Sequence, residues 1–508
     1  MMKDLLWAES QKLHRSKILW IAGFATVMVG LIVFAQGQFT FYDRRYINGA
    51  GWFMTAAQSL ATFYVLPAVI ALLGSYMICR EEQEDTLKSL RLIPVDEVKL
   101  TLAKMILAFV FSNFLSIKEE LKVSFIATPL KESLSEDNDI LPLGDTGISL
   151  LRSAVIFGAN ASGKSNVLKA LAFYKHFITD SFKGSQAGEP IDVENFHLNA
   201  TSINEPTTME ATFTDGEYIY RYGFEVNRKE VKAEWLYQRL RKKRAKELEI
   251  YYREGETTSV HQKSPLIQEI VTKKMVRSNA LLLSTIAQFN EPKAVKIMHW
   301  LNDTQVLFCS EDDKLWEQAI RHLDDETMRR RIIEFARYAD LGIEEITKVD
   351  NRLVSQHKQY DDEGKETNSV SFTFNKNESE GTIKYFSMSY PIIDALDKGK
   401  RIIVDELDSK LHPLLVCKII ALFNSAKTNP KGAQLLFTAH DTFLLSAGLF
   451  RRDQIWFTQK DGFGATSSYS LAEYKVRSTS PFEKDYLLGK YGATPIIGEM
   501  ERIFNVEE

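Results

Sequence analysis

A short glycine-containing stretch, Gly158 to Ser165 (GANASGKS), constrains this chain more than any other feature. The apolar run SAVIF at 153–157 leads directly into it, and a helix-compatible stretch, Asn166 to His176, follows. A strand, a glycine-containing turn and a helix in this order form a P-loop, because backbone N–H groups of the turn can surround a polyphosphate at the helix N-terminus. A turn that matches by chance is the alternative, but it does not account for the flanking strand and helix. The sequence therefore predicts a bound nucleotide.

Individual residues of this stretch have distinct predicted roles. Lys164 would bind the β- and γ-phosphates, and the Ser165 hydroxyl would bind the magnesium ion that bridges them. The glycines would let backbone N–H groups turn toward the phosphates. The predicted nucleotide contacts are Gly158, Asn160, Ser162, Gly163, Lys164, Ser165 and Asn166.

Two further apolar runs end in polar residues far downstream. RIIVDE at 401–406 ends in Asp405, which would hold magnesium, and Glu406, which would polarise an attacking water. QLLFTAHD at 434–441 carries His440, which would touch a γ-phosphate. Ligands of open α/β sheets bind at the carboxyl ends of the strands, so we expect these side chains to meet at the P-loop. A solvated acidic turn and a structural histidine are the alternatives.

These motifs occur in the order typical of a known group. With ESEGT at 378–382 and IIVDELDSKLHP at 402–413, they resemble the ABC-type ATPase heads of SMC-like proteins. More narrowly, residues 105–508 resemble the RloA-like abortive-infection AAA ATPases of bacteria. That likeness also rests on FSNFLSIKEE at 111–120, YADLGIEEI at 338–346, RRDQIWFTQKD at 451–461 and LLGKYGATP at 487–495. It implies an α/β P-loop ATPase head with a β arm and a helical lid insertion, and ATP and magnesium as ligands.

The resemblance also implies that the ATP site is shared between two subunits. Ser379 and Gly381 match the signature segment, which completes the site of a second subunit in an ATP-dependent homodimer, and Asp408 matches the D-loop position. ESEGT departs from the transporter form LSGGQ, having one glycine and no glutamine, which favours the SMC-like branch. Alternatively, Ser379 only caps the helix that runs through Tyr390. No Q-loop residue is assigned within 195–199.

Composition is that of a multidomain globular protein. The chain has 508 residues, 45% of them hydrophobic and 26% charged, with a net charge of −4 that argues against an overall electrostatic grip on nucleic acid. Its three scattered cysteines fit a reducing cytosol rather than a metal site or disulfide framework. One basic run beside Trp235 and Tyr237 is a candidate nucleic-acid contact, although charge runs are usually solvated faces. Its cations are Arg239, Arg241, Lys242, Lys243, Arg244 and Lys246.

The first hundred residues have a different character. Ile18–Gln36 is uncharged for 19 residues and Gly51–Cys79 for 29, so each could cross the roughly 30 Å hydrocarbon core of a bilayer. We expect transmembrane helices at about 18–36 and 55–79. Lysines and arginines are more numerous outside the pair than between the two spans, which predicts both ends in the cytoplasm. The segment 81–104 resembles ABC-2-type permeases, but two spans are too few for a complete translocation path.

These observations predict four regions along the chain. The expected regions are a permease-like fragment at 1–104, an ATPase lobe at 105–200, a β arm and helical insertion at 201–375, and a second ATPase lobe at 376–508. Because Met105 resembles the natural start of the RloA-like ATPases, the chain reads as a permease fragment fused to an ATPase. We expect a bacterial membrane location with a cytoplasmic ATPase, or a cytoplasmic one if the N-terminal fragment is an artefact.

Three functions from different classes follow. The leading one is an ATP-driven conformational switch in anti-phage defence, acting with a separate effector protein, because the chain after His440 is too short for a TOPRIM nuclease domain. The second is a membrane transport component, supported by residues 1–104 and opposed by ESEGT. The third is a DNA-repair ATPase, which would require hydrolysis stimulated by nucleic acid.

Overall fold

The computed structural model describes most of the chain after its first hundred residues. The described ranges are 108–130, 140–143, 145–261, 264–308, 311–338, 342–349, 352–477 and 480–495. The chain divides into two compact units, Met1–Leu92 and Ile93–Glu508, and every described residue belongs to the second. None of the helices in these ranges is both long enough and apolar enough to cross a bilayer. The two predicted transmembrane helices lie outside the described residues.

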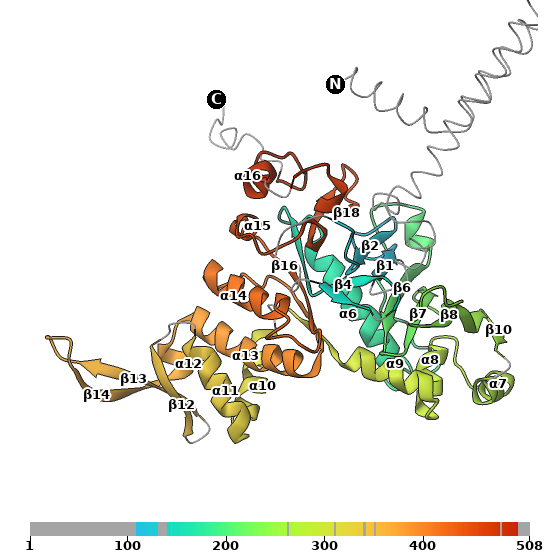
Figure 1. The fold of residues 1–508 in the computed structure, drawn as a ribbon. Coiled ribbons are helices and arrows are strands. Elements are labelled where there is room, and N and C mark those ends of the chain that lie inside the picture. Colours follow the sequence, from blue (N-terminus) through green and yellow to red (C-terminus); the bar gives the residue numbers. More distant parts are fainter. Residues whose placement is uncertain are drawn as a thin grey trace, which may run out of the picture. The chain divides into compact units, whose positions relative to one another are not determined.

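A six-stranded sheet forms the centre of the second unit (Figure 1). Its order is β11-β15-β16-β5-β17-β18, with all neighbours parallel except β17 and β18. Strands β5 and β16 are buried at every residue, as expected for parallel strands covered on both faces. The strands are β5 (Ser153–Gly158), β11 (Thr304–Leu307), β15 (Arg401–Val404), β16 (Gln434–Thr438), β17 (Ile455–Lys460) and β18 (Thr466–Ser470).

Alternate residues of this sheet face two different cores. Ile156, Ile403 and Leu436 join the core that contains α6 (Lys164–Asp180), α8 (Leu282–Gln288) and α9 (Pro292–Asn302). Phe157 and Phe437 join the other core, with α13 (Glu380–Lys398), α14 (Pro413–Asn424), α15 (Phe443–Ser446) and α16 (Phe482–Leu487). The period of two along each strand thus produces helical layers on both faces.

A second, antiparallel sheet of seven strands packs against α6 on the side opposite the central sheet. Its order is β10-β9-β8-β7-β6-β1-β2, and Tyr174 and Phe177 of α6 pack against Phe224 of β7. Strands β6 to β10 lie in the region 201–375, where the sequence predicts a β arm and a helical insertion. The strands are β1 (Ala108–Ser112), β2 (Leu121–Ser124), β6 (Thr207–Thr214), β7 (Tyr218–Val226), β8 (Val231–Leu240), β9 (Leu248–Glu254) and β10 (Thr257–Val260). A short pair, β3 (Ile140–Pro142) and β4 (Ser149–Leu151), lies apart from it.

The region from 264 to 340, which lies within the predicted β arm and helical insertion, is mostly helical but contains one strand of the central sheet. Its helices are α7 (Pro265–Thr272), α8, α9, α10 (Asp312–His322) and α11 (Glu326–Arg337), while β11 pairs with β15. This strand was missed because TQVL is only four residues long and only its first and last residues are buried.

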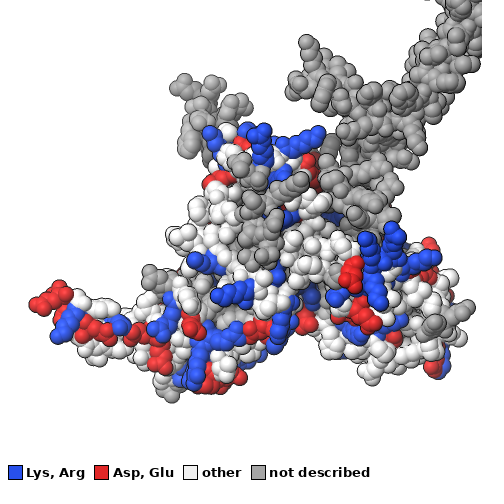
Figure 2. All heavy atoms as spheres, in the orientation of Figure 1, with Lys and Arg blue, Asp and Glu red and all other residues white. Residues whose placement is uncertain are grey.

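A small three-stranded sheet follows α11 and was not predicted. It consists of β12 (Ile343–Val349), β13 (Arg352–Tyr360) and β14 (Glu366–Thr373), and the short helix α12 (Phe374–Asn377) leads from it to α13. Its β13–β14 hairpin extends away from the helices (Figure 1). The hairpin tip is acidic, with exposed Asp361, Asp362, Glu363 and Glu366 (Figure 2). Like charge makes this tip unsuited to bind a phosphate backbone.

Candidate nucleotide-binding site

The predicted P-loop connects β5 to α6. Ala161 and Gly163 both have positive φ angles, 61° and 104°, which fold the turn back onto the start of the helix. A Cβ atom at Gly163 would overlap the side chain of Thr466, so the position accepts only glycine. The N-terminus of a 17-residue helix therefore points its free N–H groups into the turn.

Residues from distant parts of the chain brace this turn. Ser162 Oγ lies 2.8 Å from Thr458 Oγ1 of β17, and the Ser162 carbonyl accepts a hydrogen bond from Thr466 Oγ1 at 3.0 Å. Asn166 Nδ2 donates to Ser116 Oγ at 2.7 Å. The P-loop is thus held to β17, to β18 and to the turn between β1 and β2 by hydrogen bonds within the chain.

Lys164 lies within the turn and is 5% exposed. Its Nζ donates to the carbonyls of Gly158 and Ala159 at 2.8 and 3.1 Å, which leaves one of its three donors for a ligand. Burial lowers the pKa of Lys164, and the carboxylates of Glu406, Asp405 and Asp408 oppose that shift. A polyphosphate would add negative charge beside this ammonium and favour its protonated form.

Ser165 and Asp405 lie together, as the sequence predicts for a magnesium site. Ser165 Oγ donates to Asp405 Oδ1 at 3.1 Å. Adjacent oxygen ligands of an octahedral magnesium ion lie about 2.9 Å apart, so this hydroxyl and carboxylate fit two neighbouring positions. The described residues contain no cluster of three or more His, Cys, Asp or Glu that could hold a metal. Magnesium in such sites takes most of its ligands from water and phosphate, so the pair suffices.

Glu406 and His440 face each other beyond the ends of β15 and β16. His440 Nε2 lies 3.3 Å from Glu406 Oε1, and both side chains are partly exposed. Glu406 has a φ of 51°, which is unfavourable for a residue with a Cβ. Such a conformation persists only where surrounding contacts fix it, and here it turns the carboxylate toward the P-loop pocket.

Thr438, at the end of β16, provides those contacts. Its hydroxyl donates to Asp405 Oδ1 at 2.7 Å and accepts from the backbone N–H of Glu406 at 2.7 Å. Its carbonyl accepts from the N–H of Leu407. Thr438 is fully buried and was not among the predicted site residues. A hydroxyl at the end of an otherwise apolar strand is the sequence signal that could have identified it.

Replacing Thr438 by valine should therefore impair the site without changing its volume. Thr438→Val removes the hydrogen bonds that the hydroxyl makes with the Glu406 N–H and with Asp405 Oδ1, which costs about 1–3 kcal/mol of stability. We expect kcat for ATP hydrolysis to fall about 10- to 100-fold, as for other partners that orient functional side chains. Steady-state kinetics and thermal unfolding measure both effects. Thr438→Ser keeps the hydroxyl and serves as the control; a wild-type kcat for Thr438→Val would show that the hydroxyl does not position the acids.

Asp408 supports the histidine rather than lining the pocket. Its Oδ2 accepts hydrogen bonds from the backbone N–H groups of His440 and Asp441, both at 2.7 Å. Its other oxygen is buried without a hydrogen-bond partner among the described residues. Within one subunit Asp408 fixes the turn that carries His440; its predicted nucleotide contact stays a prediction.

The signature segment lies at the N-terminus of the 19-residue helix α13. Ser379 caps this helix, accepting a hydrogen bond from the Thr382 N–H at 3.1 Å, so the capping alternative describes its role within the subunit. A Cβ atom at Gly381 would lie 2.7 Å from the Lys410 carbonyl, which explains the glycine. The preceding Glu378 accepts hydrogen bonds from Ser355 and His357 of β13 at 2.5 and 2.7 Å. The segment is therefore attached to the small sheet.

One pocket of about 740 Å³ gathers most of the predicted site residues. It contains Lys164 and Ser165 with Glu406 and His440, which come from elements far apart in the sequence. The other predicted site residues do not line it: Gly158, Ser379, Gly381, Asp405 and Asp408. Lys460, which the sequence interpretation missed, does. The lining residues are Asn160, Ala161, Ser162, Gly163, Lys164, Ser165, Asn166, Glu406, His440 and Lys460.

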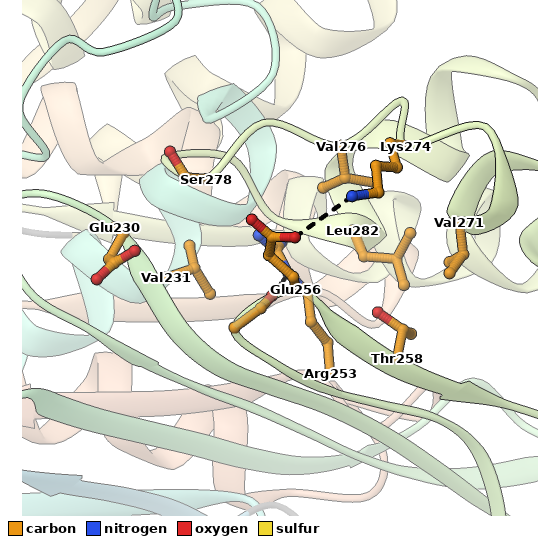
Figure 3. Close-up of a pocket in the computed structure, with 11 residues that line it drawn as sticks. Glu230, Val231, Arg253, Glu256, Thr258, Val271, Lys274, Val276, Ser278 and Leu282 are labelled. Atoms are coloured by element: carbon orange, nitrogen blue, oxygen red, sulfur yellow. Dashed lines mark hydrogen bonds and ion pairs between the residues drawn. The ribbon is translucent and has the colours of Figure 1, made fainter.

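A second pocket, of about 260 Å³, lies between the β8–β10 strands and the segment after α7 (Figure 3). Glu256 and Lys274 form an ion pair of 3.3 Å across it. The buried Arg253 guanidinium already donates to the carbonyls of Ala280 and Arg277 at 2.8 and 3.2 Å. No residue of the predicted nucleotide site lines this pocket, so it is separate from the P-loop chemistry.

The basic run occupies the end of β8 and the turn before β9. Lys242, Lys243, Arg244 and Lys246 are exposed, and Arg241 is half-buried. Arg239 is only 2% exposed, so including it among the surface cations was wrong. It lies within β8, opposite Ile219 of β7, where its side chain is buried. Any contact with a nucleic acid would use only the later residues of the run.

Comparisons with known proteins agree with these motifs. The family model described as "AAA domain, putative AbiEii toxin, Type IV TA system" matches residues 153–446, more than half of the chain. A model of the ABC-2 family transporter protein matches residues 5–134, a range that includes β1 and β2. No curated protein matches the chain.

Solved structures with low similarity to this chain include an SMC head domain and a recombination mediator protein. The SMC head domain from Thermotoga maritima is 13% identical with a TM-score of 0.34, covering 72% of this chain and 99% of that one. The recombination mediator protein RecF-ATPrS is 12% identical with a TM-score of 0.24, covering 72% of this chain and 99% of that one. The match over residues 153–446 spans the P-loop, the signature segment, both acids and His440, and the chain belongs to this AbiEii-type AAA family.

Proposed function

We propose that the chain binds ATP and hydrolyses it with magnesium. The observation that carries this proposal is the single pocket in which Lys164 and Ser165 of the P-loop face Glu406 and His440. A lysine, a helix N-terminus, a hydroxyl, and two acids at the end of one parallel strand form the set that phosphoryl transfer to water requires.

Each side chain has a distinct part in the proposed reaction. Lys164 and the P-loop N–H groups bind the phosphates and neutralise charge that develops on them. Magnesium, held through Ser165 and Asp405, would neutralise further phosphate charge. Glu406 accepts a proton from the attacking water, and His440 is held 3.3 Å away, where it can donate to a γ-phosphate oxygen. Asp408 and Thr438 fix the turns that carry these two groups.

We further propose that a second copy of the chain completes the site. Ser379 and Gly381 lie outside the pocket of their own subunit, at an exposed helix N-terminus. Such an N-terminus presents free N–H donors that suit a phosphate. ATP between two subunits would therefore join the P-loop of one to α13 of the other.

Withdrawal of magnesium tests the hydrolytic part of the proposal. ATP hydrolysis by the full chain should fall to background in a chelator and return when magnesium is added, because Lys164 alone cannot neutralise the triphosphate. Phosphate release measured over a magnesium titration gives the result. An unchanged rate in the chelator would contradict the assignment of Ser165 and Asp405.

For the biological role, we propose a conformational switch in anti-phage defence that acts with a separate effector. The AbiEii-type family description supports this reading. A specific observation also favours a transport component, since the ABC-2 transporter model matches residues 5–134. The ESEGT signature, unlike the transporter form, supports the switch over transport.

The two halves of the chain can be separated to compare these roles. A fragment from Met105 to Glu508 should stay in the soluble fraction and keep its ATPase activity, because both sheets and the pocket lie within it. The full chain should sediment with membranes, because exposed apolar spans exceed the patches that soluble proteins tolerate. Fractionation followed by ATPase assays measures both. Loss of activity in a folded fragment would make residues 1–104 part of the machine and favour transport.

A further inference from the structure

The P-loop pocket contains a second lysine that the proposed mechanism does not use. Lys460 ends β17 and lines the pocket together with Lys164, Glu406 and His440. We infer that Lys460 is a phosphate-binding residue that contacts the α- and β-phosphates of the nucleotide rather than the γ-phosphate. This inference rests on the proposed ATP site and adds to it a residue that determines affinity.

The sheet order places Lys460 on one side of the P-loop and the hydrolytic groups on the other. Strand β5, which carries the P-loop, has β16 as one neighbour and β17 as the other. His440 follows β16, and Glu406 follows β15 beyond it. Thr458 of β17 pairs with Gly158, the last residue of β5. Lys460 lies two residues further along β17, so it lies beyond the end of β5, beside the P-loop turn.

This arrangement places Lys460 and the Glu406 carboxylate on opposite sides of the pocket. The water that attacks the γ-phosphate must lie beside Glu406, so the γ-phosphate lies toward β15 and β16. The remaining phosphates then continue across the P-loop, toward β17. Lys460 is the cation that lies on that side, and it has no ion-pair partner within the described part of the chain. By contrast, Lys490 pairs with Asp485 at 2.5 Å.

Lys460 is also held in register with the P-loop. Its partner across the β17–β18 pair is Thr466, whose hydroxyl donates to the Ser162 carbonyl within the turn. Thr458, two residues earlier, lies 2.8 Å from Ser162 through its own hydroxyl. The backbone on both sides of Lys460 is therefore fixed to the phosphate-binding turn, and only its flexible side chain has to be ordered on binding.

A contact to the α- and β-phosphates is made equally by ATP, by ADP and by the transition state. Such uniform binding changes KM but not kcat. Lys460→Met should therefore weaken the binding of ATP and of ADP by the same factor, about tenfold for an exposed charge-assisted contact. The value of kcat should stay within about twofold of wild type. Lys460→Arg, which keeps the charge, should recover most of the affinity.

The experiment uses the full chain and measures the dissociation constants of ATP and ADP together with steady-state kinetics. Lys475→Met is the matched control, because Lys475 is exposed in the segment after β18 and does not line the pocket. It should behave as wild type. Equal weakening of ATP and ADP by Lys460→Met, recovered by arginine, supports the inference.

Two results would overturn it. In the first, Lys460→Met binds ATP and ADP with unchanged affinity, whereas Lys164→Ala no longer binds ATP. Lys460 would then not contact phosphate, although the proposed ATP site would still be supported. A larger loss for ATP than for ADP, or a fall in kcat, would place Lys460 at the γ-phosphate instead. If Lys164→Ala also binds ATP normally, the proposed site fails as a whole.

Discussion

Lys164→Ala is expected to lose ATP binding, whereas Glu406→Gln is expected to bind ATP normally and hydrolyse it about 10²- to 10⁴-fold more slowly. The two variants differ because one removes a positive charge that binds phosphate and the other removes a proposed base. Lys164 supplies the buried positive charge within the turn, 2.8 Å from the Gly158 carbonyl. In the proposed reaction Glu406 would supply the base, and glutamine retains its size and its backbone contact with Thr438 while removing its basicity.

Nucleotide binding and phosphate release, measured on the same preparations, separate the two effects. Lys169→Ala is a suitable control, because Lys169 lies on α6 but faces solvent, and it should match wild type. Loss of binding in Lys164→Ala must occur without a large change in thermal unfolding, since removal of a buried charge can also alter stability. Hydrolysis at the wild-type rate in either variant would contradict the assigned site.

Glu406→Gln should also form a stable dimer when ATP is present, because slow hydrolysis would preserve the nucleotide that, in the proposed site, joins the two subunits. Ser379→Arg should abolish that dimer, since a long side chain at the exposed N-terminus of α13 would block its approach to a partner's phosphates. Binding of ATP by the single subunit should persist, because Ser379 does not line its own pocket. Sedimentation with and without ATP measures the mass directly.

The helix cap has to be separated from the interface. Loss of the Ser379 cap alone costs about 1 kcal/mol, and asparagine caps a helix as well as serine does. Ser379→Asn is therefore the control for α13 stability, and Ser379→Arg should unfold at a temperature similar to that of Ser379→Ala. A mass for Glu406→Gln that does not change with ATP would argue against a shared site.

The parts of the site that the sequence predicted are those encoded by continuous local patterns. The runs at 153–157, 401–406 and 434–441 are apolar because buried parallel strands carry few polar residues, and each ends in the residues that reach the pocket. The turn at 158–165 is recognisable because only particular residues permit its backbone. Local patterns were sufficient to identify the P-loop and to select Glu406 and His440, which line its pocket.

The contributions that the sequence did not predict depend on distant pairings. Lys460 reaches the pocket only because β17 lies beside β5, and no local pattern reports that neighbour. Thr438 acts through contacts with Asp405 and Glu406 of another strand. Arg239 belongs to a run whose charge predicts a surface, yet the strand places its side chain in the interior. The direction of a side chain depends on strand register, and the number of charges in a run does not reveal that register.

Mixing two inactive variants tests the shared site most directly. A dimer of Lys164→Ala with Ser379→Arg contains one site that combines the intact P-loop of the second chain with the intact signature segment of the first. The other site in that dimer lacks both. An equal mixture should recover up to about half of the wild-type rate, because neither variant is expected to pair with itself and each mixed dimer contains one intact site of two. An ATPase rate no higher than the sum of the separate variants would contradict a site completed by a second copy.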